Sequence, residues 1–141
     1  MDKKKTVLVV ENDHRTRELI RRYVEKSGLN VIEAATADEA WNHLTHPPHP
    51  DLIITEVDLP GSRFNGIELL TRLRTRETEK HVKHIPAIVH SHFLSHPGEK
   101  GNREEQVMAL PGDNSFTTKR LITGLTERIQ EKLGGEHGFV R

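Results

Sequence analysis

The residues that suggest chemistry are polar side chains that directly follow short β-branched, apolar runs. Glu56 ends the segment 50–56, PDLIITE, whose residues 52–54 are all apolar, as in a central parallel strand, although a buried helix segment has the same pattern. In open α/β sheets, ligands bind beyond the carboxyl ends of the strands, so a carboxylate there is a candidate site residue. Polar residues in similar positions follow the other predicted strands, namely Glu11, Asn12, Asp13, Ser91 and Lys119. We expect these side chains to converge in one polar pocket.

Two other kinds of chemistry find less support in the sequence. Ser91 has histidines nearby, as a hydrolase nucleophile would, but the chain contains no nucleophile-elbow motif G-x-S-x-G. The spacing of the ten histidines matches no helical or finger-type set of metal ligands, which favours surface histidines over a metal site. Histidine ordinarily titrates near neutral pH, so His90 and His92 are candidates for pH sensitivity. We expect no enzymatic activity.

The composition is that of one small cytoplasmic domain. The chain has 141 residues, and its 21 basic residues equal its 21 acidic ones, so no global charge attracts nucleic acid or an anionic membrane. It has no cysteine, which fits a reducing compartment, and no apolar run long enough to span a bilayer. We expect a single domain over residues 1–141, with its core at about 5–133 and a tail at 134–141.

Strand and helix patterns alternate along the chain. Strands are predicted at 6–10, 31–34, 52–56, 85–89 and 115–118. Asp13 is a predicted N-cap of the first helix and Gly28 its stop, and Thr36 with Glu39 forms a predicted capping box before a helix that buries Trp41. Five strand–helix pairs predict a doubly wound parallel sheet, because parallel neighbours need crossover connections. The segment 95–112 is polar and interrupted by glycine, so its helix is predicted to be the least stable.

Four motifs resemble the receiver domain of bacterial response regulators. They are VLVVEND, PDLIITEVDLPG, IPAIVHS and GDNSFTTK, and the resemblance covers roughly residues 5–133. It implies a flavodoxin-like (βα)5 fold with the strand order 2-1-3-4-5. It also implies a switch in which an aspartate after the third strand is phosphorylated with the help of Mg²⁺, and a hydroxyl and a lysine then contact the phosphoryl group.

Several positions depart from the receiver pattern. The resemblance places the phosphoacceptor at Glu56, the acidic pair at Glu11 and Asn12, and the switch residues at Ser91, Phe116 and Lys119. Asp13 and Asp58 are two further acidic candidates for this pocket. Glu56 replaces an aspartate and adds one methylene where in-line transfer depends on position. Asn12 removes a metal-binding charge, so Mg²⁺ should bind weakly at best through Glu11, Asn12 and Glu56. His92 stands where receivers have a small residue and should narrow access to the pocket.

The resulting hypothesis is a degenerate receiver, or pseudo-receiver, of two-component signalling. It would act without phosphorylation through contact between its 95–133 face and a protein partner, either a histidine kinase or a downstream effector. An ion pair between Glu56 and Lys119 would hold the pocket closed. The alternative is an active receiver that a histidine kinase phosphorylates at Asp58 or Asp13. A third hypothesis is that the chain is the front module of a longer regulator.

Overall fold

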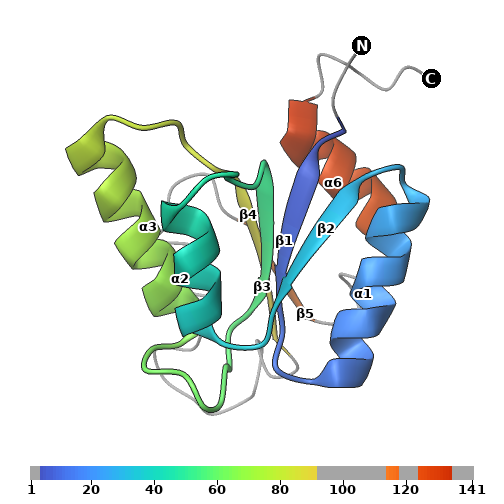
Figure 1. Cartoon of the computed structure of the whole chain (residues 1–141). Coiled ribbons are helices and arrows are strands. Elements are labelled where there is room, and N and C mark those ends of the chain that lie inside the picture. Colours follow the sequence, from blue (N-terminus) through green and yellow to red (C-terminus); the bar gives the residue numbers. More distant parts are fainter. Residues whose placement is uncertain (1–3, 92–113, 118–123, 135–141) are drawn as a thin grey trace.

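The computed structural model describes residues 4–91, 114–117 and 124–134, in which strands and helices alternate (Figure 1). The strands are β1 (Thr6–Val10), β2 (Asn30–Ala34), β3 (Leu52–Glu56), β4 (Ala87–Ser91) and β5 (Asn114–Thr117). The helices are α1 (His14–Lys26), α2 (Ala37–Thr45), α3 (Gly66–Lys80) and α6 (Leu125–Gly134). The predicted weak helix at 95–112 and the candidate residues His92 and Lys119 lie outside the described residues.

The sheet is parallel and is the middle of three layers. Its strands are ordered β2-β1-β3-β4-β5. Figure 1 shows α1 and α6 against one face of the sheet and α2 and α3 against the other. From β1 the chain crosses over to β2 on one side, and from β2 it crosses back past β1 to β3 on the other side. The direction of strand addition therefore reverses beside β1. The predicted class, a flavodoxin-like parallel α/β fold, is confirmed.

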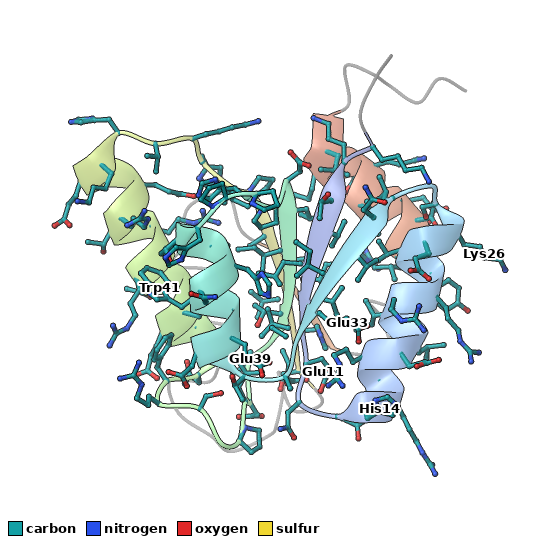
Figure 2. The ribbon with its side chains drawn as sticks, in the orientation of Figure 1. Glu11, His14, Lys26, Glu33, Glu39 and Trp41 are labelled. Atoms are coloured by element: carbon teal, nitrogen blue, oxygen red, sulfur yellow. The ribbon has the colours of Figure 1, made fainter. Side chains whose placement is uncertain are left out.

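The central strands are buried on both faces, as their unbroken apolar runs predict. Leu8 and Ile53 pack with α2 and α3, while Val9 and Ile54 pack with α1 and α6. Burying one such leucine or isoleucine fully contributes roughly 1.5–3 kcal/mol. Trp41 was predicted to be buried, but it is only partly buried and packs at the margin of the core (Figure 2). Its large ring is seldom enclosed completely.

Side-chain caps begin the first three helices. Asp13 caps α1, as predicted, by accepting a hydrogen bond from the Thr16 backbone N–H at 2.8 Å. Thr36 caps α2, but Glu39 accepts from the Ala35 N–H and not from the N–H of Thr36, so the predicted box is shifted by one residue. Helix α3 has a complete capping box, formed by the residue pair Asn65 and Glu68. Gly28, after α1, has a φ of +85°, which fits the predicted stop.

Strand β4 runs from Ala87 to Ser91, two residues later than the predicted 85–89. Pro86 has no N–H to donate to the sheet, although its carbonyl accepts from Ile53. The N–H of Ile85 is already bound by the carboxylate of Glu77 on α3, at 2.7 Å. Pairing therefore begins at Ala87, and the shift places two polar residues, His90 and Ser91, inside the strand.

Candidate functional site

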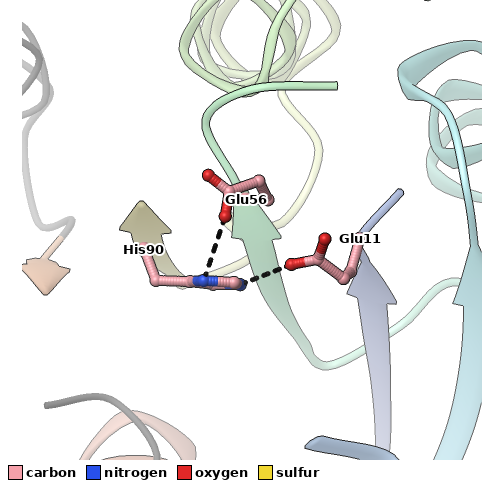
Figure 3. A group of neighbouring side chains, drawn as sticks. All are labelled: Glu11, Glu56 and His90. Atoms are coloured by element: carbon pink, nitrogen blue, oxygen red, sulfur yellow. Dashed lines mark ion pairs between the residues drawn. The ribbon is translucent and has the colours of Figure 1, made fainter. Parts of the chain in front are cut away.

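A buried cluster of two carboxyl groups and one imidazole lies at the carboxyl edge of the sheet (Figure 3). The Nδ1 atom of His90 lies 3.5 Å from Oε2 of Glu56, and its Nε2 atom lies 3.7 Å from Oε1 of Glu11. Glu11 and Glu56 are each 3% exposed and His90 is fully buried. These three groups are therefore held away from water.

The register of the sheet brings the three side chains together. Glu56 is the last residue of β3 and pairs with His90 of β4. On the other side of β3, Val10 pairs with Thr55, so Glu11 follows β1 beside Glu56. Paired residues of neighbouring strands project from the same face of a sheet, and the three side chains consequently share one space.

Each carboxyl group is anchored to the backbone through one oxygen. Oε2 of Glu11 accepts from the Asp13 N–H at 2.8 Å. Oε1 of Glu56 accepts from the N–H groups of Val57 at 3.1 Å and Asp58 at 3.3 Å. The second oxygens, Oε1 of Glu11 and Oε2 of Glu56, face His90 and accept no hydrogen bond from any described residue. The Glu56 carboxyl group is thus turned into the protein.

Burial disfavours the ionised form of both carboxyl groups. The pKa of Glu56 is raised to about 8, mainly by loss of water and next by the neighbouring Glu11 carboxylate, against the opposing effect of the backbone N–H groups of Asp58 and Val57. Burial likewise raises the pKa of Glu11 to about 7, opposed by the hydrogen bond from Asp13. At neutral pH a carboxyl group with a pKa of about 8 keeps its proton roughly nine-tenths of the time.

A glycine allows the chain to approach Glu56 closely. Gly66 begins α3, and its N–H donates to the carbonyl of Val57 at 2.8 Å. A Cβ atom on Gly66 would overlap the backbone carbonyl oxygen of Glu56. The hydroxyl of Thr55 donates to that same oxygen at 2.9 Å. The end of β3 is therefore fixed from two sides, which fixes the position of Glu56.

The structure brings together some of the predicted pocket residues and separates others. Glu11, Glu56 and Ser91 are buried at the carboxyl edge, and Asp58 is half-buried beside them. Asn12 and Asp13 are exposed, in contrast to the expected convergence. The amide Nδ2 of Asn12 donates to the Pro60 carbonyl at 3.3 Å, and Asp13 is used as the cap of α1. The side chain of Phe116 and the whole of Lys119 and His92 lie outside the described part of the chain.

His90 is the site residue that the sequence analysis missed as a member of the pocket. The sequence suggests pH sensitivity for His90 and favours surface positions over a metal site for the ten histidines, and the predicted strand ends at Val89, before His90. The signal was the strand AIVHS itself, in which a histidine occupies the position that pairs with Glu56. The expected ion pair between Glu56 and Lys119 involves a residue outside the described ranges. Among the described side chains, the basic group that faces the Glu56 carboxyl group is the imidazole of His90.

The donor set of this cluster does not suit Mg²⁺. That ion takes oxygen ligands in near-octahedral geometry, with protein carboxylates and water. Here the Asn12 amide is turned to Pro60, one oxygen of each glutamate is bound to backbone N–H groups, and the other oxygen of each faces the His90 imidazole. The residues therefore offer nitrogen where Mg²⁺ needs oxygen.

The fold and the buried carboxyl groups at its carboxyl edge define a receiver-like α/β domain. The response regulator receiver domain family matches residues 7–97. DivK, the polar-differentiation response regulator of Brucella ovis, is 31% identical over 131 residues, which are 92% of this chain and 97% of DivK. The chain belongs to the response regulator receiver domain family and is a receiver domain of two-component signalling, as the motifs indicated.

Solved receiver structures have the same fold. A response regulator from Chloroflexus aurantiacus superposes with a TM-score of 0.75 at 22% identity, over 93% of this chain and 98% of its own. The non-phosphorylated HemR receiver domain from Leptospira biflexa superposes with a TM-score of 0.72 at 20% identity, over 98% of both chains. Within the described residues, no helix has the length and apolar character needed to cross a membrane.

Proposed function

We propose that this receiver domain signals by binding a protein partner and does not use Glu56 as a phosphoacceptor. The observation that carries the proposal is the orientation of the Glu56 carboxyl group. One of its oxygens accepts from the N–H groups of Val57 and Asp58, and the other faces the buried imidazole of His90. Neither oxygen is presented to a phosphoryl donor in solution.

Phosphoryl transfer makes demands that this arrangement does not meet. The acceptor oxygen must lie in line with the leaving group, and cations must neutralise the developing charge. Glu56 is 3% exposed and carries one methylene more than the aspartate of the receiver pattern, so it would have to leave His90 and rotate outward to react. Because the donor set does not suit Mg²⁺, we also propose that this ion binds weakly and is not required.

The partner is proposed to be a histidine kinase or a downstream effector. We propose that it contacts the 95–133 face, of which residues 114–117 and 124–133 are described. With the switch held by the Glu11–His90–Glu56 cluster, the signal would depend on the abundance of the protein and on the partner, without a phosphorylated state.

The alternative function is an active receiver with another acceptor. Asp58 suits it better than Asp13 because it is half-buried next to the Glu56 carboxyl group. Asp13 is committed to its helix cap, where its carboxylate accepts from both the N–H and the hydroxyl of Thr16.

Incubation with acetyl phosphate and Mg²⁺, followed by intact-mass measurement, separates the two functions. The proposal predicts no phosphoryl group on the wild-type chain, and none on Asp58→Asn. Addition of one phosphoryl group to the wild type, lost in Asp58→Asn, would establish the alternative. Addition that persists in Asp58→Asn but is lost in Glu56→Gln would show that Glu56 itself accepts the group.

A further inference from the structure

The Glu11–His90–Glu56 cluster has the composition of a metal site of another kind. One ligand atom from each residue lies within 4.8 Å of the other two, and the three side chains come from β1, β3 and β4 or their ends. We propose that this cluster binds a divalent transition-metal ion of the Zn²⁺ class. The proposal goes beyond the proposed function, since it concerns metal occupancy and not phosphorylation.

The separations between the donors are too long for hydrogen bonds. Nδ1 of His90 lies 3.5 Å from Glu56 and Nε2 lies 3.7 Å from Glu11, whereas an N–H···O bond spans roughly 2.7–3.2 Å. A single ion would bond only one of these two ring nitrogens, and one ligand atom from each residue lies within 4.8 Å of the other two. Zinc bonds to histidine nitrogen and carboxylate oxygen are roughly 2.0–2.2 Å long, which places two ligands of a tetrahedral ion about 3.4 Å apart. The widest separation, at most 4.8 Å, would have to contract by about 1.4 Å to reach that value, a movement within reach of glutamate side chains.

Two buried oxygens in the cluster have an unused capacity to bind. Oε1 of Glu11 and Oε2 of Glu56 accept no hydrogen bond within the described residues, although both point into the space around His90. A buried polar atom without a partner is costly, so such atoms often mark an ion or a catalytic role. A cation bonded to these oxygens and to one ring nitrogen of His90 would supply the missing interaction.

The chemistry of the donors selects the ion. Imidazole together with carboxylate suits zinc and its neighbours in the transition series, while Mg²⁺ prefers oxygen alone. The second oxygen of each glutamate is already oriented by backbone N–H groups, those of Asp13 and Val57. Such outer contacts hold ligands in place and strengthen metal binding.

Calorimetry on the full chain, stripped of metal beforehand, tests the site with Zn²⁺ and Mg²⁺. One Zn²⁺ per chain should bind in the cluster, and more tightly than Mg²⁺. Loss of a group that merely orients a ligand weakens metal binding roughly 10- to 100-fold, so Glu56→Gln and His90→Gln should each lower the Zn²⁺ affinity at least tenfold. His49→Gln, which changes an exposed histidine, is the matched control and should bind Zn²⁺ as the wild type does.

A second readout needs no variant, which matters if His90→Gln does not fold. Paramagnetic Co²⁺ added to the wild-type chain at one equivalent should broaden the imidazole resonances of His90 before those of His49. Broadening confined to exposed histidines would overturn the proposal. So would Zn²⁺ affinity that is equal in wild type and Glu56→Gln, or Mg²⁺ binding as tight as that of Zn²⁺.

Discussion

Replacing Glu56 with glutamine should stabilise the chain, relative to wild type, progressively as the pH rises. The folded state holds a proton on Glu56 because burial raises the pKa of that carboxyl group from 4.5 to about 8. The unfolded chain releases this proton at lower pH. Since the folded state binds more protons between these two values, the unfolding free energy of the wild type falls as the pH increases through this window. Glutamine has the same shape and does not titrate.

The size of the effect follows from the two pKa values. One pKa unit corresponds to roughly 1.4 kcal/mol. Between pH 5.5 and 7.5 the folded carboxyl group remains mostly protonated while the unfolded one is almost fully ionised. The difference in unfolding free energy between Glu56→Gln and wild type should therefore move by about 2.5 kcal/mol in favour of the variant. Three titratable residues face Glu56 and are present in both proteins, namely Glu11, Asp58 and His90. They affect the difference only through their electrostatic interaction with residue 56.

Urea unfolding at pH 5.5, 6.5 and 7.5 measures this difference. Fluorescence of Trp41, the only tryptophan, reports unfolding because its ring packs against the core. A chelator removes any contribution from bound metal. Glu79→Gln, at an exposed glutamate of α3, is the matched control and should show no such trend. A difference that stays constant, or that favours the wild type at higher pH, would mean that Glu56 is ionised in the folded chain.

Two further substitutions test the scaffold around the site. Gly66→Ala would push a Cβ atom into the backbone carbonyl at the end of β3, so urea unfolding should show an unfolding free energy lower by about 1–3 kcal/mol or more. Gly124→Ala is the control, because its Cβ atom would meet only the end of a flexible side chain, and it should change the unfolding free energy little. Arg74→Met would remove the arginine that pairs with the buried Glu77 carboxylate, leaving it the N–H of Ile85 and the imidazole of His84, and should cost roughly 3–5 kcal/mol. Arg63→Met removes an exposed ion pair and should lower the unfolding free energy by less than about 1 kcal/mol. A larger decrease would contradict the argument that buried ion pairs matter more for stability than exposed ones.

The local features of the fold were predictable because their causes are local. The unbroken apolar run at 52–54 indicates a strand covered on both faces, and that strand is β3, ending at Glu56. The caps at Asp13 and Thr36 depend on one side chain and a nearby N–H, so their residue types predict them. The placement of Glu11 and Glu56 at the carboxyl edge of the sheet likewise follows from their positions at the ends of strands.

The contents of the pocket were less predictable because they depend on register. The start of β4 is set by Pro86 and by the hydrogen bond between Ile85 and Glu77 on α3, and no local pattern reveals that bond. The predicted strand ends at Val89 and leaves His90 beyond it, whereas β4 extends to Ser91 and buries His90 beside Glu56. The exposed position of Asn12 also depends on a contact far along the chain, with Pro60.

A crystal structure of the wild-type chain grown with Mg²⁺ and beryllofluoride, which mimics a phosphoryl group on a carboxylate, tests the central claim most directly. The claim is that the Glu56 carboxyl group is turned inward onto His90 and is not offered to a phosphoryl donor. The predicted result is a Glu56 side chain still bound to the N–H groups of Val57 and Asp58, facing His90, with no beryllofluoride on it. A Glu56 carboxyl group rotated away from His90 and carrying beryllofluoride would contradict the account.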